Sequence, residues 1–215
     1  MSAEWPVPLS GVVESVTTTL GPNDRWNAAP LGLHVDDDHD PTAPVRARSW
    51  GRTRTWRNFE HEGEGYVQFV RDPLVFADAA LGVLEVDDPV LDAATAWARV
   101  DATLVGTGER DGTRWADWTL TPTETGIEQR AVPTTERSYA AVVEMTVAAS
   151  RLGVSGYDDE TLRDRLDYFA EVARRCGGQR ERAAVDRVAE LSEWGADDGS
   201  ATPEADAPRA GRVGQ

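Results

Sequence analysis

The sequence predicts an α+β fold, in which a β-rich body of six or seven strands is followed by three helices. Extended segments separated by turn clusters occupy the chain up to about residue 132. After Pro133 the apolar residues recur with the period of a helix. A chain of 215 residues is long enough to bury a proper core. Strands first and helices last are typical of an α+β domain, or of a barrel with added helices.

Composition divides the chain into three predicted regions. We expect the strand-rich domain over residues 1–135 and the helices, a buried helix followed by a helical hairpin, over 136–194. Residues 195–215 consist largely of Ala, Asp, Gly and Pro, so we expect a disordered acidic tail there.

The first strands form a predicted hairpin. The segments Val12–Leu20 and Trp26–Val35 are largely apolar or β-branched, and the turn cluster Gly21–Asp24 separates them. Pro30 interrupts the second strand and therefore predicts an edge or bulge where the backbone is open to a ligand.

The next segments alternate strand and helix signals. Alternation over Val45–Trp50 predicts a third strand, and Gly51–Glu60 a turn or short helix. A further strand is expected over Gly65–Val70. Asp72 followed by Pro73 is typical of a helix start, and this helix should end near residue 81.

Two more strands, Arg99–Gly106 and Arg114–Leu120, should pair across the turn Asp111-Gly112. One more strand is expected over Ile127–Val132. Of the three helices, Ser138–Leu152 is apolar nearly all round and should be buried. The second is capped by Asp158 and ends at Gly177-Gly178, and the third covers roughly Arg180–Trp194.

The most informative feature for function is a local reversal of charge. The chain carries a net charge of −16, yet five of its 22 basic residues fall within residues 46–57 and no acid occurs between Pro41 and Phe59. The arginines are Arg46, Arg48, Arg52, Arg54 and Arg57, and the hydroxyls of Ser49, Thr53 and Thr55 lie between them. Guanidinium and hydroxyl groups together suit a phosphate. The alternative is a solvated arginine strand and loop.

The overall charge restricts the partners. One short basic segment is too small for nucleic acid, which needs a broad basic face, and the acidic surface disfavours anionic lipid. No apolar stretch has membrane-spanning length, and Met1–Leu9 lacks the pattern of a signal peptide, so we expect a cytoplasmic protein. The acid excess and the lack of lysine are typical of a halophilic protein, although GC-rich codon use also removes lysine.

The sequence lacks the residue patterns of metal sites, disulfides and nucleophilic catalytic sites. His34, His39 and His61 are scattered, and Cys176 is alone, so we expect no metal site and no internal disulfide. The acids of Asp36–Asp40 imitate a calcium loop, but proline stands where that loop needs glycine. No nucleophile has an evident base.

Aromatic and polar residues in the β-rich body could wall a ligand. The tryptophans there include Trp26, Trp50, Trp56, Trp115 and Trp118. Indoles can cover a flat ring, although filling a barrel core is the simpler explanation for any one of them. Asn27 could offer its amide to a ring edge, or satisfy a bulge. Glu144 in the buried helix predicts an ion pair with an arginine, or else a ligand or dimer contact.

An ordered set of motifs resembles the archaeal family known as domain of unknown function 447. The motifs are Glu14–Thr19, Asn27–Gly32, Arg48, Thr53–Phe59, Asp72–Phe76 and the late helix with Arg137, Ala141–Glu144 and Ser150–Leu152. Together they cover roughly residues 10–194. The resemblance implies an FMN-binding split barrel followed by helices, and usually a homodimer with flavin mononucleotide near the subunit interface.

The resemblance also implies the residues of the cofactor site. Arg48, Thr53 and Thr55 would hold the phosphate with Asn58 nearby, while Asn27, Ala28 and Ala29 would lie along the flavin ring. Gln68 would be another polar contact, although the family more often has asparagine there.

Three functions remain open at this point. The first is an FMN-dependent oxidoreductase or flavin reductase-like protein with an unidentified small redox partner. The second is a flavin carrier or sensor without turnover, and a related barrel could hold a deazaflavin or haem instead. The third is an interaction protein without a small ligand, in which the arginine segment docks an acidic partner.

Overall fold

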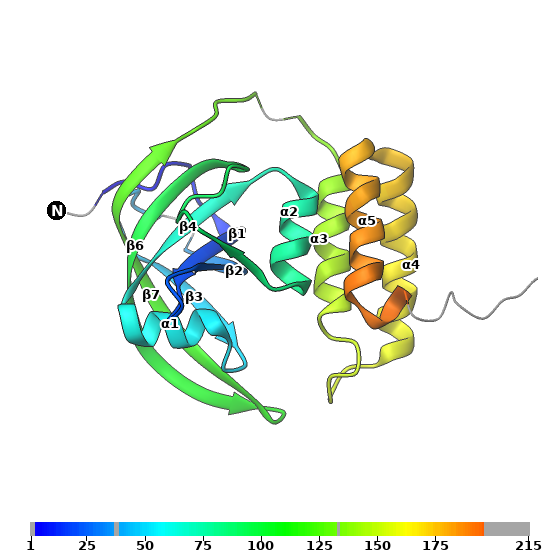
Figure 1. Ribbon diagram of the computed structural model, residues 1–215, viewed down its shortest axis with the longest axis horizontal. Helices are drawn as coiled ribbons and strands as arrows, with labels where there is room; N and C mark the ends of the chain where they lie inside the picture. The colour runs from blue at the N-terminus through cyan, green and yellow to red at the C-terminus, as the bar shows by residue number, and fades with distance from the viewer. Residues whose placement is uncertain (1–2, 37–38, 133, 196–215) are drawn as a thin grey trace, which may run out of the picture.

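The computed structural model describes residues 3–36, 39–132 and 134–195, and over these ranges it contains seven strands and five helices. A barrel lies on one side of the molecule and a layer of helices on the other (Figure 1). The predicted disordered tail, except for Gly195, lies outside the described residues.

Six antiparallel strands form the barrel. They are β1 (Gly11–Leu20), β2 (Trp26–Val35), β3 (Val45–Trp50), β4 (Glu64–Val70), β6 (Ala94–Arg110) and β7 (Thr113–Ile127). Their order is β1-β4-β6-β7-β3-β2, and pairing of β1 with β2 closes the ring. The short β5 (Leu84–Val86) adds to the edge of β2. The fold is therefore the split barrel with C-terminal helices that the sequence predicts.

Alternation decides which side chains enter the barrel. On β3 the side chains of Val45, Ala47 and Ser49 are buried, whereas Arg46 and Trp50 point to solvent. The barrel core also takes Trp56 and Phe59 from helix α1 (Arg54–Glu62). This short helix confirms the expectation of a turn or helix after Gly51.

Helix α2 (Pro73–Leu81) lies between the barrel and the C-terminal helices (Figure 1). Asp72 caps it by accepting the N–H groups of Leu74 and Val75. Phe76 packs in one cluster with Val16 of β1, whereas Ala77 packs among the C-terminal helices.

The helical layer consists of α3 (Ser138–Ala149), α4 (Asp159–Cys176) and α5 (Gln179–Leu191). Asp158 caps α4, as predicted. The helix after Pro133 is shorter than expected, since it ends at Ala149.

The strand expected over Ile127–Val132 is wrong. Strand β7 ends at Ile127, and the next two N–H groups, of Glu128 and Gln129, both bond to the carbonyl of Thr95. The β6–β7 ladder ends at the pair Ala96 and Ile127, and no strand is assigned to residues 128–132. Conversely, β6 and β7 are longer than predicted and form a projecting hairpin whose turn contains Asp111 and Gly112, both at positive φ.

Candidate functional site

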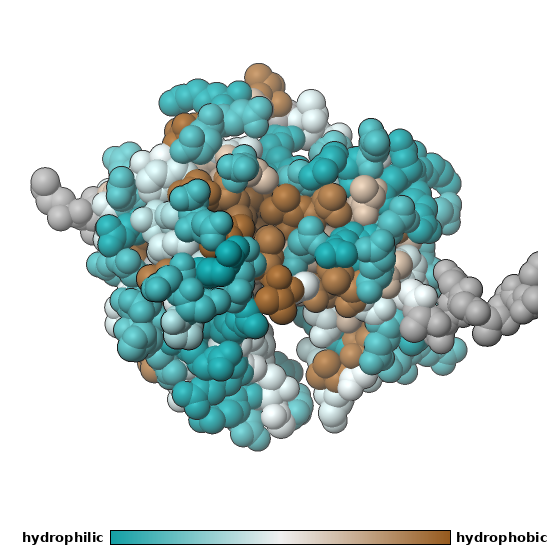
Figure 2. Space-filling model, viewed as in Figure 1, coloured by the Kyte–Doolittle hydropathy of each residue, from teal (hydrophilic) through white to brown (hydrophobic). Residues whose placement is uncertain are grey.

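A cleft of about 1560 Å³ separates the barrel from the helical layer. Figure 2 shows the molecular surface hollowed between these two parts. One wall comes from β2, β3 and the start of α1, and the other from the end of α3 and residues 150–157. The tip of the β6–β7 hairpin borders the cleft as well.

The barrel wall is open along part of β2. This strand pairs with β5 at Trp26–Ala28 and with β3 at Leu33 and His34. Between these two ladders, residues 29–32 have no partner on that side in the described part of the chain, and they line the cleft. Pro30 lies in this gap, where its missing N–H costs no ladder bond. The sequence prediction of an open backbone at Pro30 is confirmed.

The start of α1 forms the most polar part of this wall. Thr53 is the N-cap, and its hydroxyl accepts the N–H of Trp56 at 3.3 Å. Thr55 lies in the first turn, and its side chain lines the cleft although only 4% of the residue is exposed. Its Oγ1 has no hydrogen-bond partner among the described residues. A buried hydroxyl without a partner costs about 1–3 kcal/mol, so this atom is a candidate contact for a ligand.

Arg48 reaches the cleft already paired. Its Nε and Nη2 donate to the two carboxylate oxygens of Asp117 at 2.6 and 2.8 Å, because β3 and β7 place the two residues opposite each other. Its guanidinium carbon also lies 4.3 Å from the ring centroid of Trp115 and 5.6 Å from that of Trp50. The hydrogen bonds from Arg48 lower the pKa of Asp117, and those to Asp117 raise the pKa of Arg48.

Two of the arginines that line the cleft have no acidic partner in the described ranges. Arg46, Arg48, Arg54 and Arg110 are in ion pairs, with Asp36, Asp117, Glu85 and Asp111. The exceptions are Arg57 on the barrel side and Arg151 on the helical side. The predicted charge reversal is therefore partly neutralised by acids that come from other segments.

Six of the eight residues predicted for the cofactor site meet at this cleft. Asn27, Ala28 and Ala29 lie on β2, and Arg48, Thr53 and Thr55 on β3 and at the start of α1. Asn27 is nearly buried, and its amide makes no hydrogen bond within the described chain. Asn27 is thus a candidate to bond to a ligand in the cleft.

The other two, Asn58 and Gln68, are not among the residues that line the cleft. Asn58 Nδ2 donates to the carbonyl and the hydroxyl of Thr19, at 3.2 and 3.0 Å. Gln68 is fully buried, where its Nε2 donates to Thr18 Oγ1 and its Oε1 accepts the N–H of Leu91. Both side chains join strands and loops of the barrel in this structure.

The tryptophans serve different purposes. Trp56 and Trp118 fill the barrel core, as the simpler explanation predicted. Trp50 lines the cleft with 44% of its surface exposed. Trp26 meets Tyr66 edge-on, with ring centroids 5.4 Å apart. Of these, Trp50 and Trp118 are among the residues that line the cleft, and Trp118 is almost completely buried.

The sequence analysis did not predict the helical wall of the cleft. Arg151 and Tyr157 lie on it, with the guanidinium carbon 5.3 Å from the ring centroid. Glu144 of α3 pairs with Arg165 of α4 at 2.9 Å, so the predicted structural ion pair is confirmed with a partner that the sequence had not identified.

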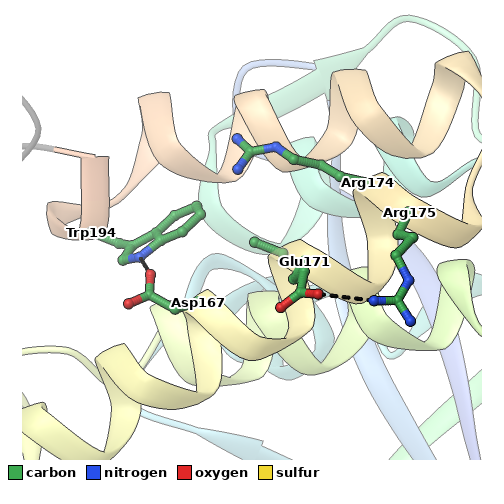
Figure 3. A pocket seen from close by; sticks show the side chains of 6 residues that line it. Asp167, Glu171, Arg174, Arg175 and Trp194 are labelled. Atoms are coloured by element: carbon green, nitrogen blue, oxygen red, sulfur yellow. Dashed lines mark hydrogen bonds and ion pairs between the residues drawn. The ribbon is translucent and has the colours of Figure 1, made fainter.

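A smaller pocket of about 400 Å³ lies on the outer side of the helical layer (Figure 3). Its polar groups bond to each other: Arg175 pairs with Glu171 at 3.1 Å, and Trp194 Nε1 donates to Asp167 at 2.9 Å.

In the described ranges, no group of three or more His, Cys, Asp or Glu side chains could hold a metal ion, and no helix is long and apolar enough to cross a membrane.

Comparison with known proteins gives two results for the family and the fold. The model for the N-terminal domain of the protein family of unknown function DUF447 matches residues 13–129, and the model for its C-terminal part matches residues 136–190. Among solved structures, the chain is similar to an FMN-bound DUF447 protein from Methanosarcina mazei, with 24% identity and a TM-score of 0.71. The match covers 85% of this chain and 96% of that chain.

Two further solved structures have weaker similarity. An FMN-binding protein from Thermus thermophilus is 15% identical with a TM-score of 0.36, and covers 60% of this chain and 81% of its own. The styrene monooxygenase flavin reductase from Pseudomonas putida S12 is 12% identical with a TM-score of 0.35. This match covers 54% of this chain and 79% of the reductase. At such scores neither supports an argument about this chain.

Proposed function

This chain belongs to the protein family of unknown function DUF447, and we propose that it is a flavoprotein that holds FMN in the cleft between its barrel and its helices. The FMN-bound protein from Methanosarcina mazei, which has a similar fold over nearly its whole length, supports this proposal. The residues of the cleft supply an independent test, because they must fit a phosphate at one end and a flat ring at the other.

The unpartnered hydroxyl of Thr55 is the observation on which the proposal rests. It lines the cleft in the first turn of α1, where free backbone N–H groups and the helix dipole favour an anion. Arg57, which also lines the cleft and has no acidic partner in the described ranges, adds a positive charge on the same helix. A phosphate there would accept the hydroxyl hydrogen that the protein leaves unused.

The ring would lie along β2. The unpaired backbone of residues 29–32 and the free amide of Asn27 offer hydrogen-bonding groups to the edge of a heterocycle. Small side chains at Ala28 and Ala29 leave room for close approach. Arg48, fixed by Asp117 and by the two indoles, adds a charged and rigid border.

We assign the protein to the flavin-dependent oxidoreductases or flavin reductase-like proteins. Bound FMN supplies the electron transfer, so the chain itself needs only to bind, orient and shield the ring. The cleft does so with a buried hydroxyl, backbone groups and one indole face. The homodimer expected from the family stays a prediction, and light scattering of the purified protein tests it.

The first experiment is an absorption spectrum of the purified protein before and after incubation with FMN and removal of the excess. We expect the visible bands of a bound flavin. A protein that stays colourless after incubation with FMN contradicts the proposal. Absorption bands of haem or of a deazaflavin would show that the protein binds that cofactor instead of FMN.

A second experiment separates an enzyme from a carrier. The FMN-loaded protein is mixed without oxygen with reduced nicotinamide cofactors, and bleaching of the flavin is followed. Bleaching supports an oxidoreductase, whereas a flavin that no donor reduces indicates a carrier or sensor.

A further inference from the structure

We infer that the helical wall of the cleft binds a second ligand, an aromatic molecule with one anionic group, through Arg151 and Tyr157. This inference rests on the proposed function, because it takes the barrel wall to be occupied by FMN. It adds the class of molecule that approaches the flavin from the opposite side.

The size of the cleft calls for more than one occupant. Pockets for a single small molecule measure about 300–1,000 Å³. The cleft measures about 1560 Å³ and has polar groups on both walls. An FMN molecule on the β2 and α1 side therefore leaves the side of α3 and residues 150–157 uncovered.

The charge of Arg151 indicates that the second ligand carries an anionic group. In a chain of net charge −16, four of the six arginines in the cleft are paired with acids. Arg57 lies near the proposed phosphate, which leaves Arg151 as a cation without an acidic partner within the described ranges. A single guanidinium group matches a single carboxylate or phosphate, since it can donate two parallel hydrogen bonds.

The position of Tyr157 beside Arg151 indicates that the second ligand has an aromatic ring. Two successive turns, from Val154 N–H to the Arg151 carbonyl and from Tyr157 N–H to the Val154 carbonyl, bring the tyrosine back beside the arginine. The guanidinium carbon then lies 5.3 Å from the ring centroid, a distance at which the ring attracts the cation. Tyr157 as a whole is 51% exposed, and Val147 and Val154 also line the cleft. An aromatic ligand can thus stack or pack here while its anionic group meets Arg151.

The cleft narrows beside this wall. Gly156 has a φ of +94°, and a Cβ atom on it would lie 3.9 Å from the Cβ of Asp111 at the tip of the β6–β7 hairpin. The hairpin and the loop 150–157 therefore almost touch. A ligand at Arg151 would therefore lie close to the point where the hairpin and this loop approach each other.

The test measures ligand binding to the FMN-loaded protein by titration calorimetry at one ionic strength. The probes are benzoate and phenyl phosphate, which distinguish a carboxylate from a phosphate, and benzamide, which is an uncharged ring. Arg151→Gln removes the charge and Tyr157→Leu the ring. Arg174→Gln is the matched control, because it removes an arginine from the helical layer outside the cleft.

We expect at least one of the two anions to bind the wild-type protein more tightly than benzamide. Arg151→Gln should lower the affinity for that anion by at least about tenfold, as expected for the loss of a charge-assisted hydrogen bond. Tyr157→Leu should weaken it by roughly threefold to tenfold, and Arg174→Gln should have no effect. FMN must stay bound in all three variants, as measured by flavin in the filtrate.

Three results would overturn the inference: equal anion affinity in the wild type and in Arg151→Gln, no binding of either anion to the wild type, or loss of FMN from Arg151→Gln. The last result would place Arg151 in the flavin site itself. A wild-type protein that retains no FMN overturns the proposed function instead, and with it the premise used here.

Discussion

Replacing Thr55 by valine should change folding and binding in opposite directions. The two side chains have nearly the same shape, so the substitution removes the hydroxyl and keeps the packing. In the free protein this hydroxyl is buried and unpartnered, and it therefore costs stability. In the FMN complex the same hydroxyl would donate to the phosphate and contribute to affinity.

The magnitudes follow from the burial of Thr55 Oγ1. Removal of an unpaired buried hydroxyl should raise the free energy of unfolding by about 1 kcal/mol, within the usual penalty of roughly 1–3 kcal/mol. For a chain of this size each 1 kcal/mol corresponds to a shift of about 2–4 °C in Tm. Loss of a hydrogen bond to a charged phosphate should weaken FMN binding by about 10- to 100-fold.

The assay is chemical denaturation of the FMN-free protein together with an FMN titration followed by flavin fluorescence. Thr53→Val is the matched control, because that hydroxyl caps α1 and its loss should lower stability by about 0.5–2 kcal/mol. If Thr55→Val destabilises the FMN-free protein, or leaves FMN affinity unchanged, the reasoning from the unpartnered hydroxyl is refuted.

Three further outcomes are expected. Asp117→Asn removes a negative charge from the cleft and leaves the charge of Arg48 without its partner, so the anionic FMN should bind severalfold more tightly in a fluorescence titration; unchanged affinity would exclude an influence of the Arg48 charge on FMN binding. Burial raises the pKa of Tyr139 from 10.0 to about 12. The unfolded chain therefore loses this proton first, and stability should fall by up to about 2.7 kcal/mol between pH 10 and 12 in urea titrations. Tyr139→Phe should abolish that part of the fall, and an identical pH profile would contradict it. Gly108→Ala places a Cβ atom 2.4 Å from Trp115 Cζ2, so it should displace the indole and cost about 1–3 kcal/mol; an unchanged tryptophan spectrum would count against this contact.

Much of the fold could be predicted because local patterns agree with the tertiary structure. The alternation over Val45–Trp50 predicted the strand β3, and Asp72-Pro73 predicted the start of α2. Other elements lack a local signal. The three residues of β5 form a strand only because β2 offers them an edge, and the alanines of Ala94–Ala98 have little preference for a strand.

The candidate site could be predicted only in part, because it depends on long-range partners. The arginine cluster predicted an anion site, and its segment does line the cleft. The sequence could not show that Asp117, 69 positions away, would be opposite Arg48, since strand register sets that pairing. Arg151 and Tyr157 were missed for the same reason: only the packing of α3 beside the barrel brings them to the cleft.

The position of α2 bears on attempts to divide the molecule. Although its sequence lies between β4 and β5, its Ala77 packs with the C-terminal helices, and Arg180 and Arg187 of α5 bind Asp72 and Asp78 at its two ends. A fragment cut at the junction near residue 135 would therefore expose the inner side of α2 and leave two carboxylates without their counter-ions. Expression of the barrel alone should yield an aggregating product, so crystallographic or enzymatic work requires the uncut polypeptide.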